Sequence, residues 1–163
     1  MSGVRVGQGI DAHRLVAGRP LRLGGVEIPF ERGLEGHSDG DVLLHAVASA
    51  LLGALGAGDL GSHFPSSDPR WHGVASRDLV EQVMELVRER GFAVGNVDAT
   101  VIAQLPRLAP FRDAMVRAVA RCLDVDPERV SVKVTSTDGL GAIGRGDGIA
   151  AQAIVLLERV ESA

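Results

Sequence analysis

Three side chains in the first third of the sequence have the chemistry of metal ligands. Asp11 and His13 stand at positions i and i+2 of the segment GIDAHR, so on a strand both side chains leave the same face. His45 follows in the apolar segment GHSDGDVLLHAV, one helical turn beyond Asp41, which we expect to orient it from the same helix face. One carboxylate and two imidazoles are an acceptable zinc set with a fourth position open for substrate. A polar strand end and a buried core histidine are the alternative interpretations.

His37 and Ser38 stand where the same apolar helix is expected to begin. The free N–H groups and the dipole of a helix N-terminus favour an anion, so phosphate is the expected guest. Capping of the helix by Ser38 is the alternative, and it is compatible with phosphate binding but leaves His37 unexplained. The loop residues His63 and His72 have no partner in the sequence pattern and are interpreted as surface residues.

A second polar segment, VTSTDGLG, combines three hydroxyl groups with one carboxylate. Hydroxyl and amide donors beside an acid suit a phosphate bound together with a second divalent cation, and a polar hairpin loop is the alternative. The next glycines, in GLGAIG, match a dinucleotide-binding pattern letter for letter. We reject that match because the pattern requires a following helix and a later acidic residue, whereas a strand is expected here.

The sequence offers no arrangement for covalent catalysis. No serine stands in the strand-to-helix elbow typical of serine hydrolases, and the only cysteine, Cys122, lies in a predicted helix without a paired base. A single cysteine also excludes an intramolecular disulfide and a cysteine-based zinc finger.

Hydrophobic periodicity places these residues on a small set of elements. Alternation predicts strands over residues 4–13 and 21–30, which we expect to form a hairpin, the second with a Gly-Gly irregularity. A buried helix is predicted over residues 38–55, with Ser38 as N-cap and Asp41 three residues on in a capping-box pattern. A helix over 76–90, a strand over 96–104, a helix over 111–123 and strands over 129–137 and 148–160 complete the chain.

The order ββααβαββ predicts an α/β (α+β) domain spanning residues 1–163, built as a two-layer sandwich of a mixed sheet with helices on one face. The other face would be a large exposed apolar patch, so a homo-oligomer that covers it is expected.

Composition excludes several classes of function. A net charge of −4 and 3% aromatic residues argue against a nucleic-acid surface of basic patches and stacking rings. No apolar run reaches the roughly 18 residues that a membrane span needs, and the first ten residues lack a signal-peptide pattern. We therefore expect a cytoplasmic protein that binds neither nucleic acid nor membrane.

Taken together, these segments resemble the 2-C-methyl-D-erythritol 2,4-cyclodiphosphate synthase family of the non-mevalonate isoprenoid pathway. The resemblance runs nearly end to end through GIDAHR, GHSDGDVLLHA, GDLGSHFPSSDP, GNVDATVIAQLPRLAP and VKVTSTDGLGAIGRGDGIAAQA, in the family's order and spacing. It implies a metal-dependent phosphorus–oxygen lyase that cyclises 4-diphosphocytidyl-2-C-methyl-D-erythritol 2-phosphate and releases CMP. It also implies a homotrimer with active sites between neighbouring subunits.

The family pattern assigns roles to residues of this chain. It implies zinc at Asp11, His13 and His45, magnesium or manganese at Asp138, and transition-state stabilisation by His37 and Ser136. Substrate contacts are implied for Asp11, His13, His37, Ser38, Asp59, Gly61, Phe64, Asp68, Ala103, Pro106, Arg107, Leu108, Ala109, Thr135, Ser136, Thr137, Asp138, Ala142 and Arg145. Of these, residues 103–109 and 135–137 are expected to supply the cytidine pocket from the adjacent subunit. Ala142 and Arg145 are expected to line a central cavity that in some relatives accepts an isoprenoid diphosphate.

This chain departs from the family pattern at four positions. Asp138 replaces a common Glu, so the second metal is held by a shorter arm or through water, and Ser136 replaces a Thr but keeps the hydroxyl. Ser66 replaces a frequent Asp, and Ala142 a frequent Phe. Two other interpretations of the same residues are a metal-dependent phosphohydrolase and a non-enzymatic protein, either a zinc-stabilised trimeric scaffold or an isoprenoid-binding protein.

Overall fold

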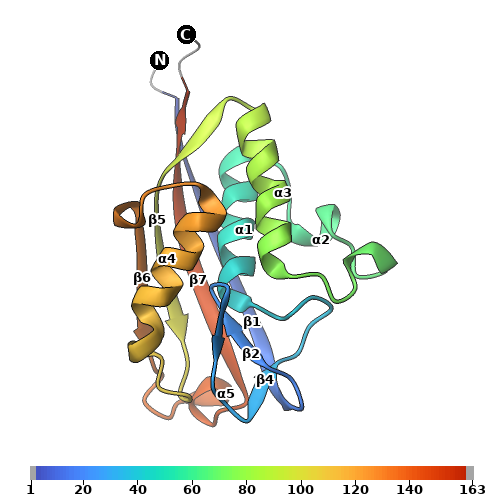
Figure 1. The fold of residues 1–163 in the computed structure, drawn as a ribbon, viewed down its shortest axis with the longest axis vertical. Coiled ribbons are helices and arrows are strands. Elements are labelled where there is room, and N and C mark those ends of the chain that lie inside the picture. Colours follow the sequence, from blue (N-terminus) through green and yellow to red (C-terminus); the bar gives the residue numbers. More distant parts are fainter. Residues whose placement is uncertain (1–2, 161–163) are drawn as a thin grey trace.

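One layer of the fold is a mixed β-sheet, which lies behind the helices in Figure 1. In the computed structural model, which describes residues 3–160, it consists of β1 (Val4–Ala17), β4 (Arg32–Leu34), β5 (Phe92–Ile102), β6 (Val130–Thr135) and β7 (Gly148–Arg159). The strand order is β4-β1-β7-β5-β6. Only β5 and β6 run parallel; the other neighbours are antiparallel.

Three long helices, α1 (Val42–Leu55), α3 (Ser76–Glu89) and α4 (Arg112–Leu123), form the second layer. Helix α1 packs on β1 and β7, α4 packs on β6, and α3 lies against α1 (Figure 1). The short helices α2 (Leu60–His63) and α5 (Gly141–Gly144) and the 3-10 turns η1 (Pro69–Trp71), η2 (Ala109–Phe111) and η3 (Pro127–Arg129) lie in the connections. The predicted α/β class with a mixed sheet is confirmed.

Helix α1 is the centre of the core because it is apolar on nearly every face, and 11 of its side chains are buried. It begins at Val42, four residues later than predicted. Its N-cap is Asp41, whose carboxylate accepts the Leu44 N–H, so the prediction that Ser38 caps the helix is wrong. Gly56 ends the helix in the left-handed conformation at φ 63°. Because of the later start, His45 lies in the first turn of the helix.

Two glycines of β1 allow α1 to approach the sheet closely. A Cβ at Gly9 would lie 2.1 Å from the Ala46 carbonyl oxygen, and one at Gly7 would lie 1.9 Å from that of Ala50. Any side chain at these positions would push the helix away. The close approach brings the first turn of α1, with His45, beside the next helix-facing positions of β1, which are Asp11 and His13.

The predicted hairpin between the first two strands is wrong. β1 pairs with β7 over the register from Val4–Glu158 to Arg14–Gly148, and only its end pairs with β4. Residues 21–30 form a separate two-stranded sheet of β2 (Leu21–Leu23) and β3 (Val26–Ile28). The Gly-Gly irregularity is its turn, since Gly24 and Gly25 both have positive φ, 58° and 76°. The elements β4, α2 and α5 were not predicted, and β5 begins at Phe92, four residues earlier than predicted.

The face of the sheet opposite the helices is open. Residues of β1 and β7 that alternate with buried ones leave large apolar side chains exposed on it, namely Val4, Val6, Ile10 and Ile154. No element of residues 3–160 covers this face. The uncovered face inferred from the sequence is therefore present, and the homo-oligomer that would cover it stays a prediction. None of the helices in the described part of the chain has the length and apolar character of a membrane span.

Candidate active site

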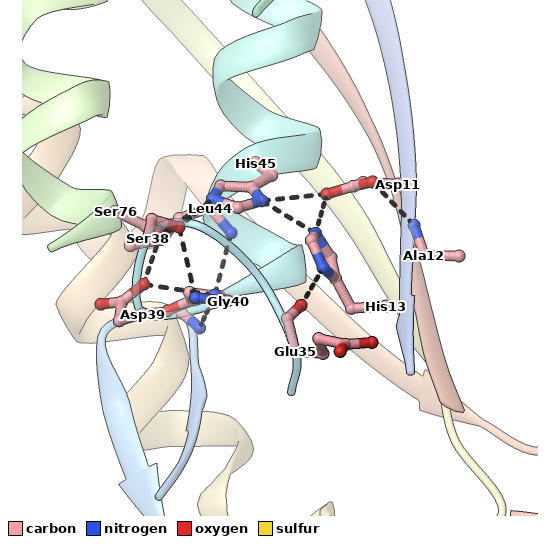
Figure 2. Close-up of polar contacts among 12 residues, drawn as sticks. Asp11, Ala12, His13, Glu35, Ser38, Asp39, Gly40, Leu44, His45 and Ser76 are labelled. Carbon is pink, nitrogen blue, oxygen red and sulfur yellow. Dashed lines mark hydrogen bonds and ion pairs between the residues drawn. The ribbon is translucent and has the colours of Figure 1, made fainter. Parts of the chain in front are cut away.

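Asp11, His13 and His45 converge at the first turn of α1, as the sequence predicts (Figure 2). His13 Nε2 lies 2.8 Å and His45 Nδ1 lies 3.0 Å from the same Asp11 oxygen, Oδ2. The two imidazole nitrogens lie 3.2 Å apart. One ligand atom from each residue lies within 4.8 Å of the others. This convergence of one carboxylate oxygen and two imidazole nitrogens can hold a divalent metal ion.

The ring nitrogens that face away from this cluster also have partners. His13 Nδ1 bonds the Glu35 carbonyl oxygen, so a proton on Nδ1 leaves the Nε2 lone pair for a metal. His45 uses the opposite nitrogen: Nδ1 faces the cluster, and Nε2 lies 3.0 Å from Ser38 Oγ and 2.9 Å from Ser76 Oγ. The donor set therefore fits a metal ion in its chemistry and its orientation.

The prediction that Asp41 orients His45 is wrong. Asp41 is fully buried, and its carboxylate accepts N–H groups of Gly24, Gly25 and Leu44 instead. Burial raises the pKa of this carboxyl, against the opposing effect of the three donors. The Asp41 carboxylate thus joins the β2–β3 turn to the start of α1. Its main-chain carbonyl, and not its side chain, contacts His45, by accepting the His45 main-chain N–H at 3.0 Å.

Electrostatics prepare the cluster for a cation. Burial alone would raise the pKa of Asp11, but the hydrogen bonds that His13 and His45 donate to it when they are protonated, together with their charge, hold this pKa well below its usual range. The hydrogen bond to Asp11 raises the pKa of His13 against the effect of burial. The carboxylate is therefore ionised at neutral pH and supplies the negative charge that a metal needs.

The cluster forms one wall of a pocket of about 430 Å³. The pocket brings together most of the substrate residues predicted on this side of the molecule: Asp11, His13, His37, Ser38, Asp59, Gly61 and Phe64, with Ser66 beside them. Its apolar lining was not predicted and consists of Ile10, Leu60, Trp71 and Leu79, with the small residue Ser49. Phe64 and Trp71 pack edge to face, with ring centroids 5.0 Å apart. The two aromatic residues within the Pro- and Ser-rich segment HFPSSDPRW were the available sequence signal for this wall.

Asp68 does not line this pocket. It begins η1, where its carboxylate accepts the Arg70 N–H and pairs with the Arg70 guanidinium at 2.6 Å. The side chain of Asp59, by contrast, caps the one-turn helix α2 and accepts the Ser62 N–H at the pocket rim. His63 and His72 are exposed, as expected; His63 Nε2 bonds the Ala57 carbonyl oxygen.

The predicted cytidine residues form a second pocket of about 230 Å³ at the carboxyl ends of the parallel strands β5 and β6. It is lined by Ala103, Gln104, Leu105, Pro106, Arg107, Leu108, Ala109, Val134 and Thr135. The loop that follows β6 carries the other predicted polar groups: Ser136 Oγ lies 3.4 Å from Asp138 Oδ1, and Thr137 Oγ1 donates to the Leu140 carbonyl. Asp138 stands outside the Asp11 cluster, at a positive φ of 53°.

A third pocket, of about 520 Å³, contains the remaining predicted residues, Ala142 and Arg145. Arg14 and Arg32 line it as well, and the Arg145 guanidinium pairs with Asp147 at 3.1 Å. The segment GLGAIG contains the one-turn helix α5 (Gly141–Gly144) and is followed by strand β7, not by the long helix that a dinucleotide-binding pattern requires. The rejection of that pattern is therefore confirmed. Burial raises the pKa of the Cys122 thiol, which leaves little thiolate for covalent chemistry.

Comparison with known proteins identifies the family to which this chain belongs. Residues 4–158 match the model of the YgbB family. The chain is 57% identical over 155 residues to the 2-C-methyl-D-erythritol 2,4-cyclodiphosphate synthase of Geobacter sulfurreducens, covering 95% of this chain and 99% of that protein. It is 56% identical to the synthase of Geobacillus kaustophilus, covering 95% and 98%. The structure of Plasmodium falciparum IspF in complex with CDP superposes with a TM-score of 0.86 at 32% identity, over 99% of both chains.

Proposed function

The chain belongs to the YgbB family, and from this membership we infer that it catalyses the reaction of the 2-C-methyl-D-erythritol 2,4-cyclodiphosphate synthases. In that reaction the 2-phosphate of 4-diphosphocytidyl-2-C-methyl-D-erythritol 2-phosphate attacks the β-phosphorus, a new P–O bond closes the eight-membered ring, and CMP leaves. The enzyme is a lyase of isoprenoid biosynthesis. The observation that supports this function at the site is the cluster of Asp11, His13 and His45, which can hold a metal ion and forms part of the wall of a pocket with a partly apolar lining.

The residues supply what this reaction needs without a general base. The nucleophile is already an ionised phosphate, so the main cost is the approach of one anion to a polyanion. A zinc ion at Asp11, His13 and His45, with magnesium or manganese near Asp138, would neutralise that charge. His37 and Ser38 line the same pocket and are placed to bind phosphate oxygens. Clamping phosphates at both ends of a flexible chain also lowers the entropic cost of closing the ring.

We propose that the cytidine moiety occupies the second pocket, at residues 103–109 and 135–137, and that Ser136 and His37 stabilise the transition state. The P. falciparum relative crystallised with CDP supports a cytidine nucleotide as the ligand class. Apolar side chains and main-chain groups line this pocket together with Thr135. The hydroxyl groups of Ser136 and Thr137 follow Thr135 in the sequence. The proposed location of the enzyme is the cytoplasm.

A homotrimer with shared sites is proposed from the arrangement of the two pockets. Three strand spacings separate β1 from β6, roughly 14 Å at 4.8 Å per strand. Asp11 lies on the helix-facing side of the sheet, whereas alternation places Thr135 on the open side. Within one chain the two half-sites therefore lie on opposite sides of the sheet, so we propose that a neighbouring subunit supplies the second half of each site. Light scattering should give three times 17.0 kDa, and mixing His45→Ala with Ser136→Ala subunits should give more activity than either variant has alone. A fully active monomer would exclude this arrangement.

A short isoprenoid diphosphate is proposed as a weak ligand of the third pocket. Arg14, Arg32 and Arg145 supply positive charge there, while Ala142 provides little apolar surface. We expect calorimetry with geranyl diphosphate to show weak binding that Arg145→Ala abolishes and Ala142→Phe tightens. Tight binding by the wild type that Arg145→Ala leaves unchanged would rule the proposal out.

Phosphorus NMR tests the reaction directly. The purified protein, incubated with the cytidyl substrate, zinc and magnesium, should produce CMP and a cyclic diphosphate. Inorganic phosphate as the product would favour the metal-dependent phosphohydrolase, and the absence of turnover with a fully metallated protein would favour a binding scaffold.

A further inference from the structure

A chain of polar side chains extends behind His45, on the side away from the metal-binding cluster (Figure 2). His45 Nε2 lies 2.9 Å from Ser76 Oγ, and the Ser76 hydroxyl in turn donates a hydrogen bond to Asp39 Oδ1. Ser76 is completely buried, with 0% of its surface exposed. Its neighbour Asp39 is held by the Asp41 N–H at 3.2 Å. The loop residue Asp39 and the first residue of α3, Ser76, are thus linked in a chain to Nε2 of His45 on α1.

Ser76 has no other evident role in the fold. It is the first residue of α3, where a serine ordinarily caps the helix, but the N-cap position is Ala75 and no side chain caps this helix. A buried hydroxyl without a partner costs about 1–3 kcal/mol, so its presence requires compensation. Its contacts here are His45, Asp39 and Ser38, the last at 3.3 Å.

The direction of the hydrogen bonds follows from the chemistry of the groups. A carboxylate only accepts, so Ser76 must donate its single proton to Asp39. The lone pairs of Ser76 Oγ then face His45 Nε2, and an acceptor at this position favours the imidazole tautomer that carries its proton on Nε2. The lone pair of His45 therefore lies on Nδ1, the nitrogen that points to Asp11 and His13.

Ser38 cannot select this tautomer by itself. Its hydroxyl accepts the Gly40 N–H at 3.2 Å and lies 3.0 Å from His45 Nε2, where it is able either to donate or to accept. His13 needs no such device, because its Nδ1 bonds the main-chain carbonyl of Glu35, which can only accept. The orientation of His45 alone depends on side chains behind it.

We propose that Ser76 and Asp39 are positioning residues for the metal site: acting in series, they hold His45 in the Nε2–H tautomer and thereby set the affinity of the protein for its metal. The proposal rests on the proposed metal site at Asp11, His13 and His45. Partners of this kind behind a ligating histidine typically change metal affinity about 10- to 100-fold when removed.

Zinc titration of the metal-free full chain tests the proposal. By calorimetry with a competing chelator, Ser76→Ala and Asp39→Ala should each bind zinc about 10- to 100-fold more weakly than the wild type. Because the two residues act in series, the double variant should be no more than about two-fold weaker than Ser76→Ala. Asp126→Ala is the matched control: the Asp126 carboxylate also accepts the N–H two residues on, at 3.0 Å, but it caps η3, outside the pocket. It should keep wild-type affinity.

A second measurement separates positioning from a loss of stability. In nitrogen-15 NMR of the zinc-loaded wild type, His45 should show a protonated Nε2, and Ser76→Ala, which removes the acceptor next to that nitrogen, should broaden or remove that signal. Wild-type zinc affinity in both Ser76→Ala and Asp39→Ala would overturn the proposal and leave the metal site intact. If the wild type itself bound no zinc, the metal site and the proposal would both be wrong.

Discussion

The two halves of the candidate active site are built in different ways. The metal half, around Asp11, His13 and His45, lies on a long strand and a buried helix, and each imidazole has a partner on both nitrogens. In the other half, which we propose binds the nucleotide and call the nucleotide half, the polar groups lie on exposed loops after β5 and β6, and their hydrogen bonds are local, as between Ser136 and Asp138. One half is organised before any ligand arrives, and the other presents donors that a ligand or a neighbouring subunit can use. A change in the metal half should therefore affect metal binding and fold together, whereas a change in the nucleotide half should affect turnover alone.

Loss of a metal ligand should have the largest effect. His45→Ala removes the only ligand supplied by α1, so zinc affinity should fall by more than about 100-fold, and turnover should fall about 100- to 1,000-fold or more. Elemental analysis after dialysis and a CMP-release assay measure the two effects. His72→Ala, at an exposed histidine outside the pocket, is the control. Undiminished zinc in His45→Ala would show that the ligand set is different.

The metal ion should also stabilise the metal half. Its ligands join β1 to α1, so removal of zinc by a chelator should lower the melting temperature, and added zinc should restore it. In His45→Ala the chelator should change the melting temperature little. An equal shift in both proteins would place the stabilising zinc elsewhere.

A substitution remote from the ligands should test how rigidly the metal half is held. Gly9→Ala places a Cβ 2.1 Å from the Ala46 carbonyl, so α1 must move, at a cost of about 1–3 kcal/mol in the free energy of unfolding. Gly53→Ala is the matched control on the same interface, because its Cβ would lie an ordinary 3.6 Å from the nearest atom, Gln8 O. The control should be neutral or up to about 1 kcal/mol more stable. Urea unfolding measures both, and equal effects would show that the close approach does not matter.

The nucleotide half should separate turnover from metal binding. Ser136→Ala removes an exposed hydroxyl whose nearest side-chain partner, Asp138, is 3.4 Å away, so the fold should be unaffected. We expect kcat to fall about 10- to 100-fold, and zinc affinity to stay within two-fold of the wild type. Steady-state kinetics and zinc titration on the same preparation provide the comparison. A large loss of zinc would show that the two halves are coupled within one chain.

The same contrast explains what could be predicted from the sequence. Asp11 and His13 share a strand face by local alternation, and residue type then indicates a metal, so the ligand set could be predicted. The partner of β1 could not, because β7 lies about 140 residues further along the chain and any apolar strand satisfies the same pattern. The contact of Asp39 with Ser76 spans 37 residues, and the local pattern of each favours a turn or a helix cap. The family resemblance supplied the residues of the nucleotide half, where spacing alone indicated only a polar loop.

The smallest expected effect concerns a carboxylate on the open face, Asp98 of β5, which pairs with Lys133 of β6 at 2.6 Å. The hydrogen bond from Lys133 lowers the pKa of Asp98, as the two histidines lower that of Asp11 in the metal half. A lowered pKa in the folded state means that the stabilisation is present above the unfolded pKa of about 3.9 and is lost as the pH falls through the folded value. Both side chains are about half exposed, so solvent screening limits the contribution to about 0.2–1 kcal/mol. Asp98→Asn should therefore be less stable than the wild type by this amount at pH 7 and equally stable near pH 2, as measured by urea unfolding at both values. A difference that persists at pH 2 would mean that the side chain contributes through packing and not through its charge.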